Sequence, residues 1–265
     1  MHKSHNPHCQ CSPQCAEPPL RGSPFCATHQ KQCYIKAPLS GYEPVYNPAR
    51  YNGKAAAQNS HNCFAYAFDV MDMPPPDKCN EKECFVPFHQ PGRRSGYPRW
   101  STLPDKRCPD VVSRIKADVP GVSMSSFTRR CPKGTSKIAL VIDADQDYHF
   151  YRQDSNGYWS HKPGGTQVTN RDSTGRRIYN PQLASRDSGR LNYDVFCSFM
   201  CVPRKKTHTL KRGGTRSAKR TKSTRGTRAR RVGGNRATRK QSLNRIMTPS
   251  GTYDEPAFPS IEPSR

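Results

Sequence analysis

HNCFAYAFDV, residues 61–70, predicts the helix on which the rest of this chain is expected to pack. We expect the helix over residues 62–72, because the three prolines that follow Met73 cannot continue it. Cys63 falls in its first turn, where the free N–H groups and the macrodipole of a helix stabilise a thiolate. On its position alone, however, Cys63 is better interpreted as a buried structural cysteine.

The segments downstream of this helix predict an antiparallel sheet. IALVID (138–143) is typical of a buried strand, and residues 148–153 and 158–161 flank a turn to form a hairpin. DVFCSFMCV (194–202) is apolar on both faces and predicts a central strand. A short amphipathic helix is expected at 111–118. A helix followed by an antiparallel sheet gives an α+β fold.

Two histidines of the hairpin change the interpretation of the cysteine. A two-residue turn would place His149 and His161 on opposite faces of the sheet. A three-residue turn with Gly157 in the left-handed conformation pairs His161 with Tyr151 and places both histidines on one face. The Asn-Gly pair in the turn favours the second register. One imidazole would then accept the Cys63 proton while the other orients it; the alternative is two half-buried rings beside aromatic residues.

Residues 61–161 resemble the NlpC-type papain-like cysteine peptidases. That family has a nucleophilic cysteine at a helix start, a basic histidine on a strand and a third polar residue on the next strand, which correspond here to Cys63, His149 and His161. Its usual Asp-Cys-Ser-Gly is replaced by Asn-Cys-Phe-Ala. The resemblance implies a papain-like fold, and it makes Tyr51 the candidate for a tyrosine that lines the site.

The chemistry implied is hydrolysis of a peptide or other amide bond. His149 would deprotonate Cys63, the thiolate would attack a carbonyl, and the Cys63 backbone N–H would help to hold the oxyanion. Deamidation and acyl transfer use the same groups and stay open. A further resemblance, to uncharacterised proteins of large DNA viruses and some bacteria, is carried by GYEPVYNPARYN (41–52) and DYHFYRQDSNGYWSHKPGG (147–165). It implies a biological setting but no activity.

The first 35 residues are rich in cysteine and histidine, at spacings that suit a zinc-knuckle-like metal site. So short a segment has little core, so a metal would have to order it. The alternative is a disordered, reduced arm. The six candidates exceed the four ligands of one zinc ion. Our choice is Cys11, Cys15, Cys26 and His29, with Cys9 and Cys33 as alternates.

Cysteine usage also predicts a compartment. The N-terminus lacks an apolar secretory core, so we expect an intracellular protein, in host cytoplasm or nucleus or in a virion, whose twelve cysteines are reduced. Cys79, Cys84, His89 and Cys108 form a second, loosely spaced cluster. We interpret its cysteines as surface thiols rather than as zinc ligands.

Charge is concentrated near the C-terminus. The net charge is +24, and residues 204–253 contain 17 Lys and Arg but no Asp or Glu. A flexible chain of one charge sign binds polyanions by counterion release, so we expect sequence-independent nucleic-acid binding by residues 204–248. A localisation signal or a solubilising tail is the alternative. The predicted contacts are Arg204, Lys205, Lys206, Lys211, Arg212, Lys219, Arg220, Arg228, Arg230 and Arg231.

Three parts result: residues 1–35, a domain at 36–203 with an irregular insertion at 73–110, and a disordered tail at 204–265. No apolar run approaches the roughly 20 residues of a membrane span. The leading hypothesis is a viral cysteine peptidase or amide hydrolase that its tail tethers to nucleic acid or to a virion. The alternative is a non-enzymatic nucleic-acid-binding structural protein on an inactive papain-like scaffold.

Overall fold

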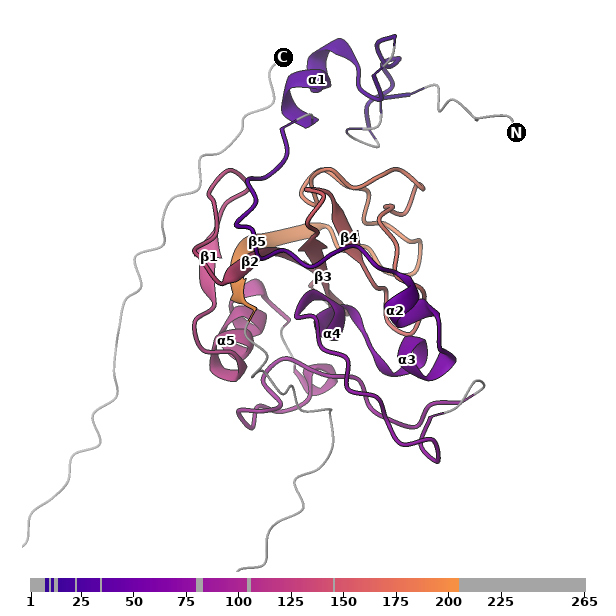
Figure 1. Cartoon of the computed structure of the whole chain (residues 1–265), viewed down its shortest axis with the longest axis vertical. Helices are drawn as coiled ribbons and strands as arrows, with labels where there is room; N and C mark the ends of the chain where they lie inside the picture. The colour runs from indigo at the N-terminus through magenta and orange to yellow at the C-terminus, as the bar shows by residue number, and fades with distance from the viewer. Residues whose placement is uncertain are drawn as a thin grey trace, which may run out of the picture. The chain divides into compact units, whose positions relative to one another are not determined.

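A five-stranded antiparallel sheet forms the centre of the computed structural model, with the strands in the order β1-β5-β2-β3-β4 (Figure 1). Strand β5 lies inside the sheet between β1 and β2, which confirms the central strand predicted from its apolar residues. The hairpin and the buried strand before it are confirmed as β3–β4 and β2. The strands are β1 (Ser123–Ser125), β2 (Thr135–Asp143), β3 (Asp147–Gln153), β4 (Trp159–His161) and β5 (Val195–Pro203).

The structure describes residues 8–9, 11, 14–21, 23–33, 35–79, 83–103, 106–144 and 146–204, all of which belong to one unit. The predictions for the tail from Lys205 onward, including its disorder, lie outside these residues. Among the helices of the described residues, none is long and apolar enough to cross a bilayer.

The helices are short. The helix predicted at 62–72 is α4, which ends at Ala67 because Asp69 adopts a left-handed φ of 59°. The helix predicted at 111–118 is α5, and it begins three residues earlier, with a proline in its first turn. In the described part of the insertion at 73–110, a 3₁₀ turn at Trp100–Thr102 precedes α5. The helices are α1 (Ala27–Cys33), α2 (Ala49–Asn52), α3 (Ala55–Ser60), α4 (Cys63–Ala67) and α5 (Cys108–Asp118).

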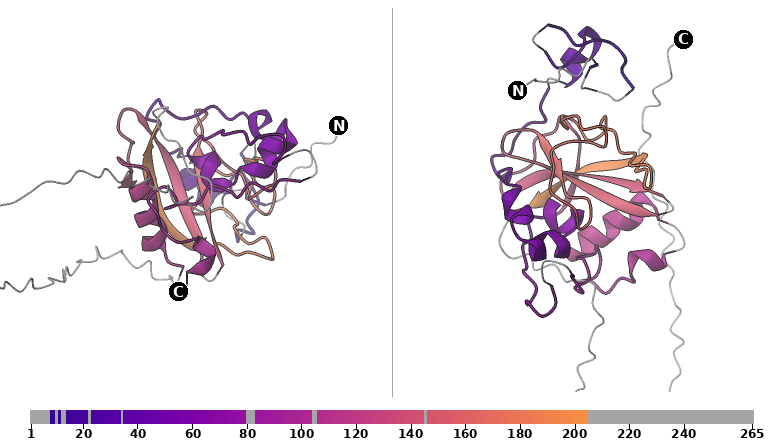
Figure 2. Two further views of the ribbon diagram at one scale, coloured as in Figure 1. Left: turned by 90° about the horizontal axis from the view of Figure 1, so that it is seen from below. Right: turned by 90° about the vertical axis from the view of Figure 1, so that its right-hand side faces the viewer.

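Both faces of the sheet are covered. Helices α4 and α5 lie on one face, and the loops that precede β5 lie on the other (Figure 2). Leu140 and Phe150 point toward the helices, whereas Val141 and Tyr151 pack on the opposite face. Because side chains alternate along a strand, His149 shares the second face with Tyr151.

The hairpin has the register predicted from its turn. Tyr151 pairs with His161, and Gly157 has a φ of +82°. A side chain at position 157 would be strained in this left-handed conformation, so glycine is what permits the three-residue turn. His149 and His161 therefore lie on one face, as the sequence predicts.

Four disulfides correct the prediction of reduced thiols. Cys108 and Cys197 join α5 to β5, and Cys131 and Cys201 join a loop to β5. A bulge in β5 shifts the register between Leu140 and Val141, so that Cys197 and Cys201 reach opposite faces of the sheet. The remaining pairs are Cys79–Cys84 and Cys11–Cys33. Cys108, Cys79 and Cys84 are thus neither surface thiols nor zinc ligands.

Candidate functional site

A chain of hydrogen bonds holds the two histidines of the hairpin. His149 Nε2 lies 2.7 Å from His161 Nδ1, and His161 Nε2 lies 2.9 Å from the carbonyl oxygen of Arg171. His149 is only 3% exposed. Two buried imidazoles in contact are costly unless their protons are ordered. The Arg171 carbonyl, at which this series of hydrogen bonds ends, therefore decides the tautomers of both rings.

Burial keeps both rings neutral at pH 7. It lowers the pKa of His149 well below its ordinary value, with a further contribution from His161, and lowers the pKa of His161 to about 4. A carbonyl oxygen only accepts, so His161 carries its single proton on Nε2 and accepts at Nδ1. His149 must then donate from Nε2. Its Nδ1 is left as a bare lone pair, which is the form a general base requires.

A cavity of about 230 Å³ lies beside this pair. Its walls include His149, Tyr151 and His161, together with the loop residues Arg171 and Arg186. Arg186 donates to the carbonyl oxygens of Tyr193 and Asp194, so its guanidinium holds the loop that precedes β5. The histidine pair thus faces a cavity whose outer wall is this loop.

Cys63 is the first residue of α4, as predicted. Asn62 caps the helix, because its side-chain oxygen accepts from the Ala65 N–H at 3.1 Å. The Asn62 amide group also donates to the carbonyl of His89 at 2.8 Å, which joins the helix start to the insertion. The residue before the cysteine therefore fixes where the helix begins.

The Cys63 thiol lies against the backbone of β3. Its sulfur is 3.9 Å from the carbonyl oxygen of Tyr148. Burial, and after it the Asp147 carboxylate, raises the pKa of this thiol well above its ordinary value, and the backbone N–H groups of Phe150 and Phe64 offset this only in part. Cys63 is 5% exposed, so the resting group is a buried, neutral thiol.

The Cys63 sulfur and the imidazole ring of His149 lie on different sides of β3. The sulfur meets backbone groups on either side of His149, whereas the His149 ring lies on the face opposite α4. Within the part of the chain that the structure describes, neither imidazole hydrogen-bonds to the thiol, and Cys63 does not line the cavity. The histidines are brought together as predicted, and the thiol lies beside the strand that carries one of them.

Tyr51 and Cys63 belong to different core clusters. The Tyr51 hydroxyl donates to the carbonyl of Val70 at 3.0 Å, and its ring packs edge-on against Tyr66 in a separate cluster. Burial raises the pKa of Tyr51 to about 12. These contacts give Tyr51 a structural role, and its service to the site stays a prediction.

Tyr193 is a site residue that sequence analysis missed. Its ring lies 5.2 Å from the ring of His149, and its hydroxyl donates to Asp147 at 3.1 Å. The residue comes from an irregular loop just before β5, and no motif marks it. Tyr193 covers the histidine and ties its loop to the start of β3.

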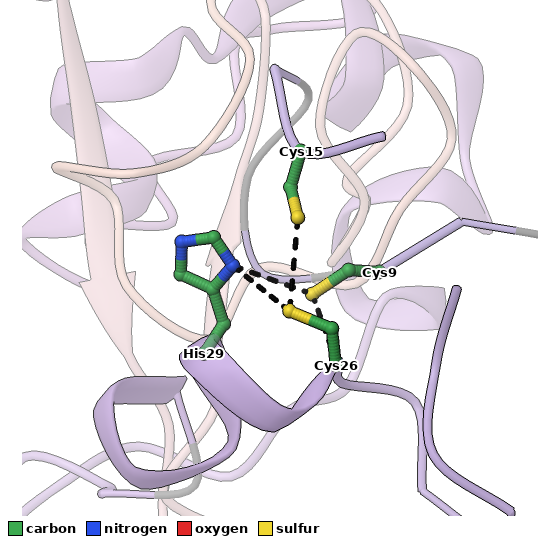
Figure 3. Close-up of side chains that lie close together, drawn as sticks. All are labelled: Cys9, Cys15, Cys26 and His29. Carbon is green, nitrogen blue, oxygen red and sulfur yellow. Dashed lines mark hydrogen bonds between the residues drawn. The ribbon is translucent and has the colours of Figure 1, made fainter. Parts of the chain in front are cut away.

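A second candidate site lies in the N-terminal segment. The ligand atoms of Cys9, Cys15, Cys26 and His29 all lie within 4.8 Å of one another (Figure 3). Cys26 Sγ is 3.2 Å from His29 Nδ1 and 3.7 Å from Cys15 Sγ. A tetrahedral metal with bonds of about 2.3 Å separates its ligand atoms by about 3.8 Å, so these four groups fit one metal ion.

The predicted ligand set is corrected at one position. Cys11 is bonded to Cys33, which removes both from the ligands. Cys9, an alternate in the prediction, takes the place of Cys11, and its sulfur accepts from the Cys26 N–H at 3.3 Å. Such an N–H group favours a thiolate at Cys9, as a metal ligand requires.

Comparison with known proteins places the chain in a family. It is 34% identical over 137 residues to the insoluble matrix shell protein 1 of Ruditapes philippinarum, an alignment that covers 49% of this chain and 73% of that protein. The chain belongs to the family of this shell protein. No family model matches the chain, and no solved structure matches it.

In this member of the shell-protein family, the first predicted nucleic-acid contact belongs to the domain. The Arg204 guanidinium donates to the Ser136 hydroxyl and to the carbonyl of Ala67. Burial lowers the pKa of Arg204 to about 10, a value at which it is still charged at pH 7. Arg204 therefore anchors the end of β5 and is not a free cation of the tail.

Proposed function

We propose that this member of the shell-protein family is a papain-like thiol hydrolase that cleaves peptide or other amide bonds with Cys63, His149 and His161. The observation that carries the proposal is the ordered proton chain from His149 to the Arg171 carbonyl. It leaves His149 Nδ1 as an oriented, unprotonated base beside the strand backbone that the sulfur contacts. A buried, oriented pair of histidines is typical of a catalytic site.

The proposed reaction needs no standing thiolate. In the resting chain the thiol and the His149 ring lie on opposite sides of β3, so the reaction requires the Cys63 side chain to turn toward His149 when substrate binds. The Cys63 sulfur then attacks the carbonyl carbon while its proton passes to His149 Nδ1, and the Cys63 backbone N–H at the start of α4 stabilises the oxyanion. The C–N bond then breaks, and the amine leaves with the proton from His149. Water attacks the thioester with His149 again as base, which releases the acid and restores the thiol.

Labelling of Cys63 tests this proposal. A peptide-like electrophile should label the wild-type chain at residue 63, as located by peptide mass spectrometry, and should not label that position in Cys63→Ala. A small alkylating reagent should react with Cys63 at pH 7 more slowly than with free cysteine, and about tenfold faster per pH unit up to pH 9, because burial raises the thiol pKa.

Two results of these labelling measurements would contradict our expectations. A reactivity plateau between pH 5 and 7 would indicate a thiolate–imidazolium pair and contradict the neutral thiol. A thiol that the peptide-like electrophile fails to label in the folded chain, but labels after unfolding, would reject the hydrolase.

A second candidate is a non-catalytic structural component of an extracellular matrix. It is favoured by the similarity to an insoluble matrix shell protein. The four disulfides also favour it, since disulfides persist in oxidising compartments outside the cell. The same disulfides lead us to propose an exported protein in place of the intracellular one expected from the sequence. Failure of folded Cys63 to react would support this candidate.

Zinc is the metal we propose for the N-terminal site. Three thiolates and one imidazole form a typical structural zinc set, and zinc would order a segment that has little core. The full-length chain should contain one zinc per molecule by elemental analysis, and Cys9→Ser and Cys26→Ser should lower that content several-fold.

Cys11 provides the matched control for the zinc site. Cys11→Ser changes the same kind of atom two residues from Cys9, but Cys11 is bonded to Cys33. We expect this variant to keep its zinc. Equal loss from Cys9→Ser and Cys11→Ser would contradict the assignment of ligands.

A further inference from the structure

Two buried polar groups in the cavity beside the histidine pair have unused hydrogen-bonding capacity. One is the Nδ1 lone pair of His149, and the other is the hydroxyl of Tyr151, a residue that is 2% exposed. In the described part of the chain, neither group has a hydrogen-bond partner. A buried polar group that its own chain leaves unpaired costs free energy, so both groups favour a ligand that pairs with them.

These two groups have complementary hydrogen-bonding roles. His149 Nδ1 can only accept, because the single proton of this ring is on Nε2. Burial raises the pKa of Tyr151, so its hydroxyl keeps its proton at pH 7 and can donate. The rings of His149 and Tyr151 lie 5.1 Å apart on one face of β3, and the Tyr151 ring also packs at 4.9 Å from that of His161. The cavity therefore offers an acceptor and a donor on rings that packing holds in place.

The charged side chains of the cavity wall are already paired with the backbone. The Arg186 guanidinium donates to carbonyl oxygens of residues 181, 182, 193 and 194. The Asp172 carboxylate accepts from the backbone N–H groups of Arg176 and Ser185. The exposed Arg171 donates to a backbone carbonyl as well. Because the backbone already satisfies these groups, the wall favours a neutral ligand over an ionised one.

The size of the cavity and its two unpaired groups define the ligand. A volume of about 230 Å³ is below that of pockets for whole small molecules, so it suits a single side chain. A primary carboxamide carries an N–H donor and an oxygen acceptor on one edge, whereas the N–H and C=O of a trans peptide bond point in opposite directions. We propose that the cavity binds the carboxamide of a glutamine or asparagine side chain, whose NH₂ group donates to His149 and whose oxygen accepts from Tyr151.

The carboxamide site narrows the substrate of the proposed hydrolase, and its chemical consequence rests on that proposal. Attack by the Cys63 sulfur breaks the C–N bond of the carboxamide, and ammonia leaves with the proton that His149 received from the thiol. Water then hydrolyses the thioester, so that one carboxamide and one water give one carboxylate and one ammonium ion. The Tyr151 hydroxyl stabilises the oxygen on which negative charge develops.

An NMR titration of the full-length chain labelled with ¹⁵N-histidine tests the site. N-acetylglutamine N-methylamide should shift the Nδ1 resonance of His149, which is assigned by its absence from His149→Ala. The glutamate analogue should bind about tenfold or more weakly at pH 7, because a carboxylate oxygen would meet the His149 lone pair. Tyr151→Phe removes only the hydroxyl and should weaken binding of the glutamine analogue by about 3- to 10-fold.

Tyr158→Phe is the matched control, because it removes a hydroxyl of the same hairpin that does not line the cavity. It should bind as the wild-type chain does. Equal affinity for the glutamine and glutamate analogues, or a His149 resonance that neither analogue shifts, would overturn the carboxamide site. Ammonia is measured in the same samples. Binding without ammonia supports the site and counts against the hydrolase, whereas labelling of Cys63 without carboxamide binding overturns the site and leaves the hydrolase.

Discussion

His149→Ala is expected to slow acylation of Cys63 by a peptide-like substrate or probe by about 10²- to 10⁴-fold, the usual contribution of a positioned base. The expected loss is large because burial makes the thiol a poor acid, so attack at pH 7 depends on proton transfer to His149 Nδ1. The measurement is the rate of acyl-enzyme formation by mass spectrometry in single-turnover experiments.

His161→Asn provides the graded control for this result. An asparagine oxygen can still accept from His149 Nε2, so we expect a smaller loss than with His161→Ala, in which the His149 tautomer is no longer fixed. A variant that merely unfolded would lose the distinction between Asn and Ala. An unchanged rate in His149→Ala would remove His149 from the mechanism.

Joint replacement of Cys108 and Cys197 by serine is expected to lower the free energy of unfolding by about 4.6 kcal/mol. The two cysteines are 89 residues apart, and in the chain-entropy model such a long closed loop restricts the unfolded chain strongly. The measurement is equilibrium unfolding in guanidinium chloride, followed by the fluorescence of the two tryptophans, Trp100 and Trp159.

Cys79 and Cys84 supply the matched comparison. Their separation is only 5 residues, so their joint replacement by serine should cost about 2 kcal/mol in the same model. Equal costs for the two pairs would contradict the chain-entropy explanation. An unfolding midpoint unaffected by loss of Cys108 and Cys197 would show that this bond does not form in solution.

The features that sequence analysis predicted correctly depend on neighbours in the chain. The hairpin register follows from an Asn-Gly turn, and the shared face of His149 and His161 follows from that register. The start of α4 follows from the polar residue that caps it, Asn62. Such local chemistry also marks β2 and β5 as buried strands. Their order in the sheet needs contacts that no local pattern encodes.

The features that were missed depend on pairs far apart in the chain. Cys197 and Cys201 are four residues apart, yet their partners lie 89 and 70 residues away, and a bulge turns them to opposite faces. The choice between Cys9 and Cys11 as a metal ligand depended on whether Cys33 would capture one of them. Tyr193 belongs to the site only because its loop folds over β3.

Strand β5 also determines how the domain bears mechanical load. Force applied to the tail is transmitted to the domain at Arg204 and then to Cys201, three residues earlier. Tension there passes through the Cys131–Cys201 disulfide into the loop between β1 and β2 and, at Cys197, through the second disulfide into α5, so the sheet is not unzipped one hydrogen bond at a time. A chain tethered by its C-terminus would therefore keep its histidine pair intact under tension until a disulfide is reduced.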